Sequence, residues 1–138
     1  MEKIYSKIEP NILLHLVNRF SEIEGRNDVA PVEEFLQLAT LKMTKGQTFK
    51  PHKHITLIKE TNIAQESWVI IKGSVKCIFY DLDDQIIAEP ILYPGDCSMT
   101  FRGGHNYIIL EEDTIVYEYK TGPYLGQEFD KVFLNNKN

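Results

Sequence analysis

The sequence lacks a long hydrophobic run, a set of cysteines and an excess of basic residues, and each absence excludes a class of protein. No segment approaches the ~20 apolar residues that a membrane-spanning helix needs. Cys77 and Cys97 are too few for a disulfide framework, and both lie in apolar runs, so we expect reduced, buried thiols. The net charge of -5 disfavours nucleic acid or an anionic membrane surface as the main partner.

The N-terminal apolar run, residues 12–17, is short, is interrupted by His15 and lacks a small-residue cleavage site. These features disfavour a secretory signal, so we expect a cytoplasmic protein with no membrane insertion. Apolar side chains recur at near-helical spacing over residues 10–20, which predicts one amphipathic helix. Residues 21–31 are polar and predict a loop.

From Val32 onward, short apolar runs alternate with turn residues. The runs cover residues 35–43, 49–57, 68–71, 75–80, 86–92, 98–101, 107–110 and 115–119. Many short strands without a long helix indicate an all-β sandwich or closed barrel. The length suits a single domain, which we divide into a helix and connector (1–31) and a barrel with a C-terminal tail (32–134).

Two histidines, His52 and His54, stand one residue apart in one of these predicted strands. Because side chains on a strand alternate between faces, both imidazoles are expected to point the same way. Glu66 lies seven positions before Gly73 and adds a carboxylate on a neighbouring strand. Imidazole nitrogens with a carboxylate oxygen suit divalent transition metals, so the pattern predicts a metal site.

The spacing resembles the first motif of the cupin superfamily. The matching positions are Gly46, five residues, His52-x-His54, then Glu66, six residues and Gly73. The resemblance implies a double-stranded β-helix (jelly-roll barrel) holding Zn, Fe, Mn or Ni. It also implies a further histidine ligand after a Pro-Gly turn, here His105 after residues 94–95.

Eleven residues separate His54 from Glu66, where the family usually has three or four. Glu60 lies within this insertion, so the carboxylate ligand stays open between Glu60 and Glu66. We favour Glu66, since its spacing to Gly73 is kept and residues 66–73 read as one strand into a turn.

A closer resemblance covers roughly residues 36–130. Pro-His-Lys-His at 51–54 and Glu-x-Lys-x-Gly-Pro-Tyr at 118–124 are similar to WbuC-type cupin-fold metalloproteins. This implies a role in surface polysaccharide (O-antigen or capsule) biosynthesis, with a sugar or nucleotide-sugar ligand and a homodimer. The candidate dimer contacts are the helix at 10–20 and the tail. We expect the apolar tail residues 129–134 to pack on the barrel or on a partner, and residues 135–138 to fray.

Three further side chains are candidates for substrate binding. Arg102 offers a bidentate clamp for a carboxylate or phosphate, Trp68 shares a strand face with Glu66, and Tyr107 can line the mouth of a sugar site. Glu118 and Lys120 share a strand face and are expected to pair with each other.

The reaction implied by the resemblance is an isomerisation or epimerisation, in which the metal polarises a carbonyl. No catalytic residue can be assigned from the sequence. Two alternatives stay open: a non-catalytic saccharide-binding cupin and an iron-dependent oxygenase.

Overall fold

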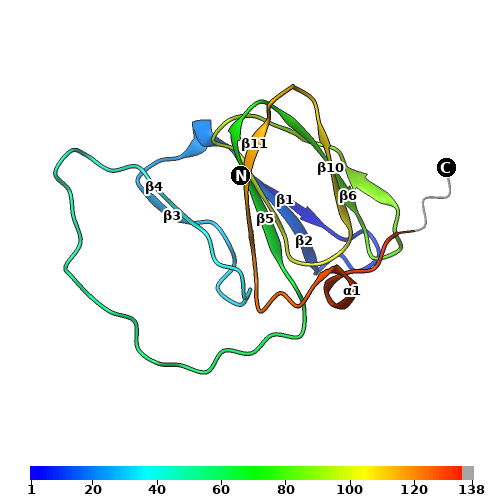
Figure 1. Cartoon of the computed structure of the whole chain (residues 1–138), viewed down its shortest axis with the longest axis horizontal. Coiled ribbons are helices and arrows are strands. Elements are labelled where there is room, and N and C mark those ends of the chain that lie inside the picture. Colours follow the sequence, from blue (N-terminus) through cyan, green and yellow to red (C-terminus); the bar gives the residue numbers. More distant parts are fainter. Residues whose placement is uncertain (135–138) are drawn as a thin grey trace.

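A computed structural model of the chain describes residues 1–134, which form a predominantly β structure of antiparallel sheets (Figure 1). The strands are β1 (Glu2–Tyr5), β2 (Leu13–Asn18), β3 (Arg26–Asp28), β4 (Ala39–Leu41), β5 (Glu66–Lys72), β6 (Val75–Tyr80), β7 (Ile86–Ala88), β8 (Ile91–Leu92), β9 (Cys97–Thr100), β10 (His105–Ile109) and β11 (Ile115–Lys120). The short helical elements are η1 (Phe20–Glu22) and α1 (Gln127–Asp130). The prediction of a β-rich chain is confirmed.

Two sheets form what we call the body. One is five-stranded in the order β1-β2-β9-β5-β11, and the other is four-stranded, with the order β10-β6-β7 and β8 paired with β6. Their facing sides share one apolar core, in which Val17 and Ile70 of the first sheet meet Val75, Cys77 and Phe79 of the second. Burial of this apolar surface is the main term that holds the sheets together.

The outer face of the five-stranded sheet is also covered. The segment between β3 and β4 contributes Val29, Ala30 and partly buried leucines, which pack on Leu16, Met99 and other apolar side chains of β2 and β9. The five-stranded sheet is therefore covered on both faces, and every residue of β2 and β9 is buried.

The predicted N-terminal helix at residues 10–20 is wrong. Residues 13–18 form β2, which pairs with β1 on one side and with β9 on the other, and every residue of β2 is buried. A continuous apolar run is expected of a strand buried on both faces, and its periodicity does not distinguish it from a buried helix. Residues 13–18 are buried inside the body and are therefore not exposed for contact with a second copy, whereas Phe20 at the end of the predicted segment is exposed.

The strand predicted at residues 49–57 does not form either. The stretch 42–65, which we call the arm, contains no strand or helix and runs from β4 to β5 in a wide arc (Figure 1). The sheets do not close into a barrel: within residues 1–134, β11 ends the five-stranded sheet and β10 ends the four-stranded sheet. Pro51, which lacks an N–H donor, also weakens any strand through the arm.

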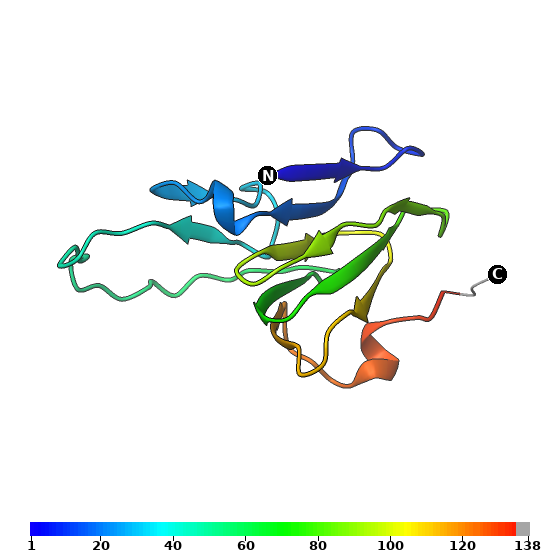
Figure 2. The same ribbon diagram turned by 90° about the horizontal axis from the view of Figure 1, so that it is seen from above.

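The small ribbon β3–β4 lies beside the body and leads into the arm (Figure 2). Lys42, the first arm residue, donates its backbone N–H to the carbonyl of Gly25 at 2.7 Å. The last arm residue, Gln65, is held by Thr121, whose hydroxyl accepts the backbone N–H of Gln65 at 3.0 Å. Both ends of the arm are thus fixed to ordered structure, while its middle packs on neither sheet.

The tail, residues 129–134, reaches the body at Leu134. Leu134 lies near Gly104, whereas Phe129, Val132 and Phe133 are exposed. The predicted packing of these three on the body is therefore wrong, and their packing on a partner stays a prediction. The predicted fraying of residues 135–138 falls outside the described residues.

Two predictions from composition can be compared with residues 1–134. Cys77 and Cys97 are free and buried, as expected, and burial raises the pKa of Cys77 to about 12 and that of Cys97 to about 11. In this described part, no helix is long and apolar enough to cross a membrane.

Candidate functional site

Glu66 and His105 form a pair that bridges the two sheets of the body. Glu66 begins β5 and His105 begins β10, so the pair lies at one end of both strands. The Nε2 atom of His105 lies 3.2 Å from Oε1 of Glu66, and both side chains are largely but not fully buried. Two of the four predicted metal ligands therefore meet, although they are far apart in sequence.

The surroundings of Glu66 favour its charged form. Burial alone raises the pKa of this carboxyl, but the hydrogen bond and charge of His105, with the charges of Lys131 and Lys120, bring the pKa below its ordinary value. The indole Nε1–H of Trp68 also donates to Oε1 of Glu66 at 3.1 Å. Glu66 is thus a carboxylate at neutral pH, the form in which it accepts a proton or binds a cation.

Trp68 and Tyr107 stack beneath the pair. Trp68 lies two residues after Glu66 on β5 and Tyr107 two residues after His105 on β10, and their rings stack with centroids 3.9 Å apart. The Tyr107 hydroxyl lies 3.2 Å from Oγ of Ser98, and burial raises the pKa of Tyr107 well above its ordinary value. The structure therefore places two of the three predicted substrate-binding side chains beside Glu66 and His105.

Lys120 adds a positive charge beside the pair. It is the register partner of Glu66 on β11, and its Nζ lies 3.1 Å from Oε1 of Glu118 and 3.9 Å from the centre of the Tyr124 ring. Burial lowers the pKa of Lys120, but Glu118 and Glu66 outweigh it and raise the pKa above the ordinary value. The predicted pairing of Glu118 with Lys120 is confirmed. The proximity of Lys120 to Glu66 was missed, because it depends on the register between β5 and β11.

His52 and His54 lie on the exposed arm. Their ring centroids are 5.6 Å apart and nearly perpendicular, and Nδ1 of His52 donates to the carbonyl of Lys50 at 2.9 Å. The two rings are neighbours, as expected, but the strand that was to align them is absent. Glu60, the alternative carboxylate, is also exposed on the arm.

The four predicted ligands are thus found as two separate pairs, one on the body and one on the arm. Within the described residues, no three His, Cys, Asp or Glu side chains are close enough together to hold one metal ion. The donor types nevertheless fit a transition metal, since three imidazoles and a carboxylate are ordinary ligands for such ions. Neither pair alone supplies the three protein donors of a typical catalytic zinc site.

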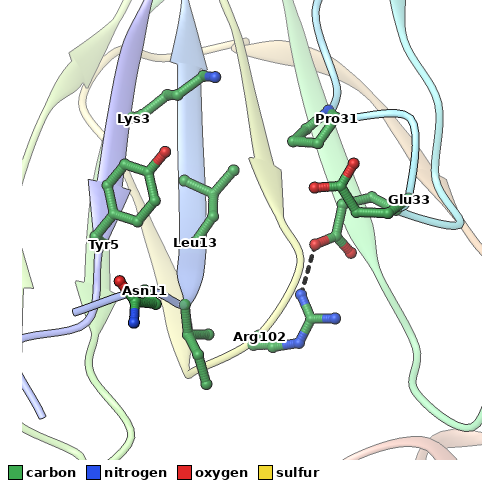
Figure 3. A pocket seen from close by; sticks show the side chains of 9 residues that line it. Lys3, Tyr5, Asn11, Leu13, Pro31, Glu33 and Arg102 are labelled. Atoms are coloured by element: carbon green, nitrogen blue, oxygen red, sulfur yellow. Dashed lines mark hydrogen bonds and ion pairs between the residues drawn. The ribbon is translucent and has the colours of Figure 1, made fainter. Parts of the chain in front are cut away.

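Arg102 has a different partner from the one predicted. Its Nη1 donates to Oε1 of Glu34 at 2.6 Å, and the other oxygen of Glu34 accepts from Nε2 of Gln65, also at 2.6 Å. Figure 3 shows this ion pair at the side of a cleft of about 470 Å³ between β1, β2 and the segment that contains Glu33. Arg102 thus links its loop to the segment that covers the outer face of the sheet. Glu34 was missed, because nothing in its sequence context indicates burial.

His15 is a core residue rather than a ligand. Its Nε2–H donates to the carbonyl of Tyr80 and its Nδ1 lies near the Thr100 hydroxyl, both at 3.1 Å, and its ring stacks on Phe79. Burial lowers the pKa of His15 to about 4, so the imidazole is neutral at pH 7. It lies in β2, a strand in place of the predicted helix.

The turn before His105 needs glycine. Gly103 has a φ of +76°, a conformation that side chains disfavour, and a Cβ atom there would lie 2.5 Å from the carbonyl oxygen of Tyr80. This close approach brings the chain from β9 to the start of β10.

The fold and site geometry can be set against known proteins. No family model, curated protein or solved structure matches this chain. The assignment to a class of protein therefore depends on the two short motifs and on the geometry of the Glu66–His105 pair.

Proposed function

We propose that this chain is a metal-binding protein of the cupin type that acts on a sugar or nucleotide sugar in surface polysaccharide biosynthesis, with His52, His54, Glu66 and His105 as the metal ligands. The observation that carries the proposal is the contact between Glu66 and His105. Glu66 was predicted from its spacing to Gly73 and His105 from the resemblance to the second cupin motif, and the two residues lie on different strands of different sheets. The free state of both cysteines fits the cytoplasm as the place of action.

The choice of Glu66 over Glu60 has a physical basis. Glu66 is largely buried and hydrogen-bonded to a second ligand candidate, whereas Glu60 is exposed. A carboxylate fixed by neighbouring donors is better oriented for a metal than a free one on a loop.

A bound divalent metal would act as a Lewis acid on a substrate carbonyl or hydroxyl. The aromatic stack beneath the pair would orient a sugar ring, and the Lys120 ammonium would offset negative charge on a substrate oxygen. Lys120 and Tyr107 both have raised pKa values and stay protonated at neutral pH, so neither is a general base. Glu66 is ionised at neutral pH, but its lowered pKa makes it a weak base and its proposed role is to bind the metal, so no described residue is assigned as the proton acceptor of an isomerase or epimerase.

The second candidate is a saccharide-binding protein without catalytic activity. The observation that favours it is that Glu66 cannot both bind the metal and accept a proton from a substrate. If Glu66 binds the metal, the described site holds no other carboxylate free of a partner, since Glu118 pairs with Lys120. The Trp68–Tyr107 stack would still bind a sugar ring. The iron-dependent oxygenase stays a third proposal, and only the types of the candidate metal ligands support it.

The test of ligand identity uses two matched substitutions. Glu66→Gln should lower cobalt affinity more than about 100-fold, beyond the 10- to 100-fold loss typical of an outer-shell partner. Glu60→Gln should leave the affinity within about twofold. Equal losses in both variants, or a loss only in Glu60→Gln, would overturn the assignment of Glu66.

The test of activity starts from the metal-loaded wild-type protein. Proton NMR of a panel of nucleotide sugars should show one converted to an isomer, and chelation should abolish that conversion. Saturable sugar binding without conversion would favour the binding protein. Consumption of dissolved oxygen by the iron-loaded protein would favour the oxygenase.

A further inference from the structure

The arm exposes apolar side chains that contact neither sheet of the body. Four large ones lie within ten residues, namely Phe49 (56% exposed), Ile55 (84%), Leu57 (67%) and Ile58 (84%). Single exposed apolar residues are ordinary, but a group of this size on an extended segment marks an interaction site. The arm is thus suited to pack against another surface.

The open edges of the body flank the candidate site. β10 begins with His105, and β11 ends with Lys120, the register partner of Glu66. Within residues 1–134, neither strand has a partner on its outer side, so both present unpaired backbone N–H and C=O groups. Edges of this kind recruit extended segments by strand addition.

The charges of the two surfaces are complementary. The arm carries five lysines and one glutamate. The turn before β11 carries three exposed acidic residues, Glu111, Glu112 and Asp113, and β11 adds Glu118. Lys72 and Lys120 offset part of this negative charge, since each lies near one of these carboxylates. Opposite potentials favour docking of the arm at this edge.

The direction of the arm indicates which copy it reaches. Its first residue continues the β3–β4 ribbon, and the arm then extends away from the sheets (Figure 2). An extended chain covers ~3.3–3.6 Å per residue, so the arm can reach a neighbouring copy while both its ends stay fixed. In the observed conformation the middle of the arm is exposed and contacts neither sheet of its own body, which favours docking on another copy.

We propose that two copies exchange arms, so that His52 and His54 of one copy complete the metal site formed by Glu66 and His105 of the other. The exchange rests on the proposed metal site for its functional consequence. It buries the apolar arm residues, pairs the open edges and gives a closed dimer with two equivalent sites. In this dimer, neither copy holds a complete site by itself.

Subunit complementation tests the exchange. One variant carries His52→Ala and His54→Ala, and the other carries Glu66→Gln and His105→Ala; each alone should bind no cobalt. The two are unfolded together in urea and refolded at equal amounts. Exchanged arms then restore one site in each mixed dimer, so random pairing gives about one quarter of the wild-type cobalt content. With arms docked on their own bodies, every site keeps one damaged pair and the mixture binds none.

A second measurement separates the exchange from the metal assignment. Light scattering should give a dimer for the wild type and a monomer for a chain in which residues 43–63 are replaced by a short glycine–serine linker. The linker variant should fold, because the arm does not pack on the body, and circular dichroism checks this. If the wild type loads cobalt but the refolded mixture does not, the exchange is wrong and the metal site stands. If the wild type loads no cobalt, the metal site is wrong. A dimeric wild type with a monomeric linker variant would then still support the exchange. A linker variant that stays in the same oligomeric state as the wild type would overturn it.

Discussion

The body and the arm carry the same kinds of metal-ligating side chain, but they hold them in opposite ways. Glu66 and His105 are fixed by strand pairing, by a mutual contact at 3.2 Å and by the aromatic stack beneath them. His52 and His54 lie on an exposed segment without a strand partner. The body is thus a preorganised half of the proposed site, and we expect the arm half to take up a fixed geometry on docking.

The largest expected difference between the two regions is in how much a substitution lowers the free energy of unfolding. Phe79 is fully buried and stacks on His15, so Phe79→Ala should lower the free energy of unfolding by about 3–5 kcal/mol. Leu57→Ala in the arm should change it by less than about 0.5 kcal/mol at a concentration where the chain is monomeric. Urea denaturation followed by circular dichroism gives both values. If Leu57→Ala lowered the free energy of unfolding of the monomer by as much as a core substitution does, the arm would be shown to pack on its own body.

The body should also respond to pH through His15. The unfolded imidazole titrates near its ordinary value of 6.5, but the pKa of the buried one is lowered to about 4, so below pH 6.5 the unfolded state binds the extra proton. The His15 contribution is therefore complete above pH 6.5 and is lost as the pH falls towards 4, by on the order of 3 kcal/mol.

The measurement is the unfolding free energy at pH 7 and pH 4.5 for wild type and His15→Gln. The free energy of unfolding of His15→Gln should fall clearly less between these two pH values than that of the wild type. If the free energy of unfolding fell equally between pH 7 and pH 4.5 in His15→Gln and in the wild type, His15 would not be a buried neutral imidazole.

A smaller effect distinguishes two roles of Arg102 on the body. Removing its guanidinium in Arg102→Leu leaves the buried carboxylate of Glu34 with Gln65 as its remaining side-chain partner. Because Arg102 is partly exposed, we expect a loss of only about 1 kcal/mol of stability and no change in cobalt affinity. Arg26→Leu, which breaks the exposed pair with Asp28, serves as the control and should be near neutral. An unchanged stability with weaker sugar binding would instead favour the predicted clamp.

The sequence predicted most strands of the body, because the apolar runs between turn residues correspond to β5, β6, β9, β10 and β11. It failed at β2, where burial on both faces removes the alternation that distinguishes a strand. It failed at residues 49–57, where the local pattern is strand-like but no partner strand is present in the chain's own fold.

The candidate site was predicted in part for related reasons. The spacing to Gly73 indicated Glu66 and the family resemblance indicated His105, and the alternation of side chains on strands placed Trp68 on the same side as Glu66. The roles of Lys120 and Glu34 depend on strand register and on contacts between distant segments, which single-sequence patterns do not contain.

The central claim is that the pairs on the body and on the arm bind one metal ion together. Trp68 is the one tryptophan in the chain and lies within hydrogen-bonding distance of Glu66, so its fluorescence reports on this site. Titration with cobalt, a paramagnetic quencher, should reduce the fluorescence of the wild type and saturate at about one ion per chain. The quenching should disappear in Glu66→Gln and equally in the double variant His52→Ala/His54→Ala, and should persist in Lys50→Ala/Lys53→Ala. Saturable quenching that survives the loss of both arm histidines, or no quenching in the wild type, would contradict the claim.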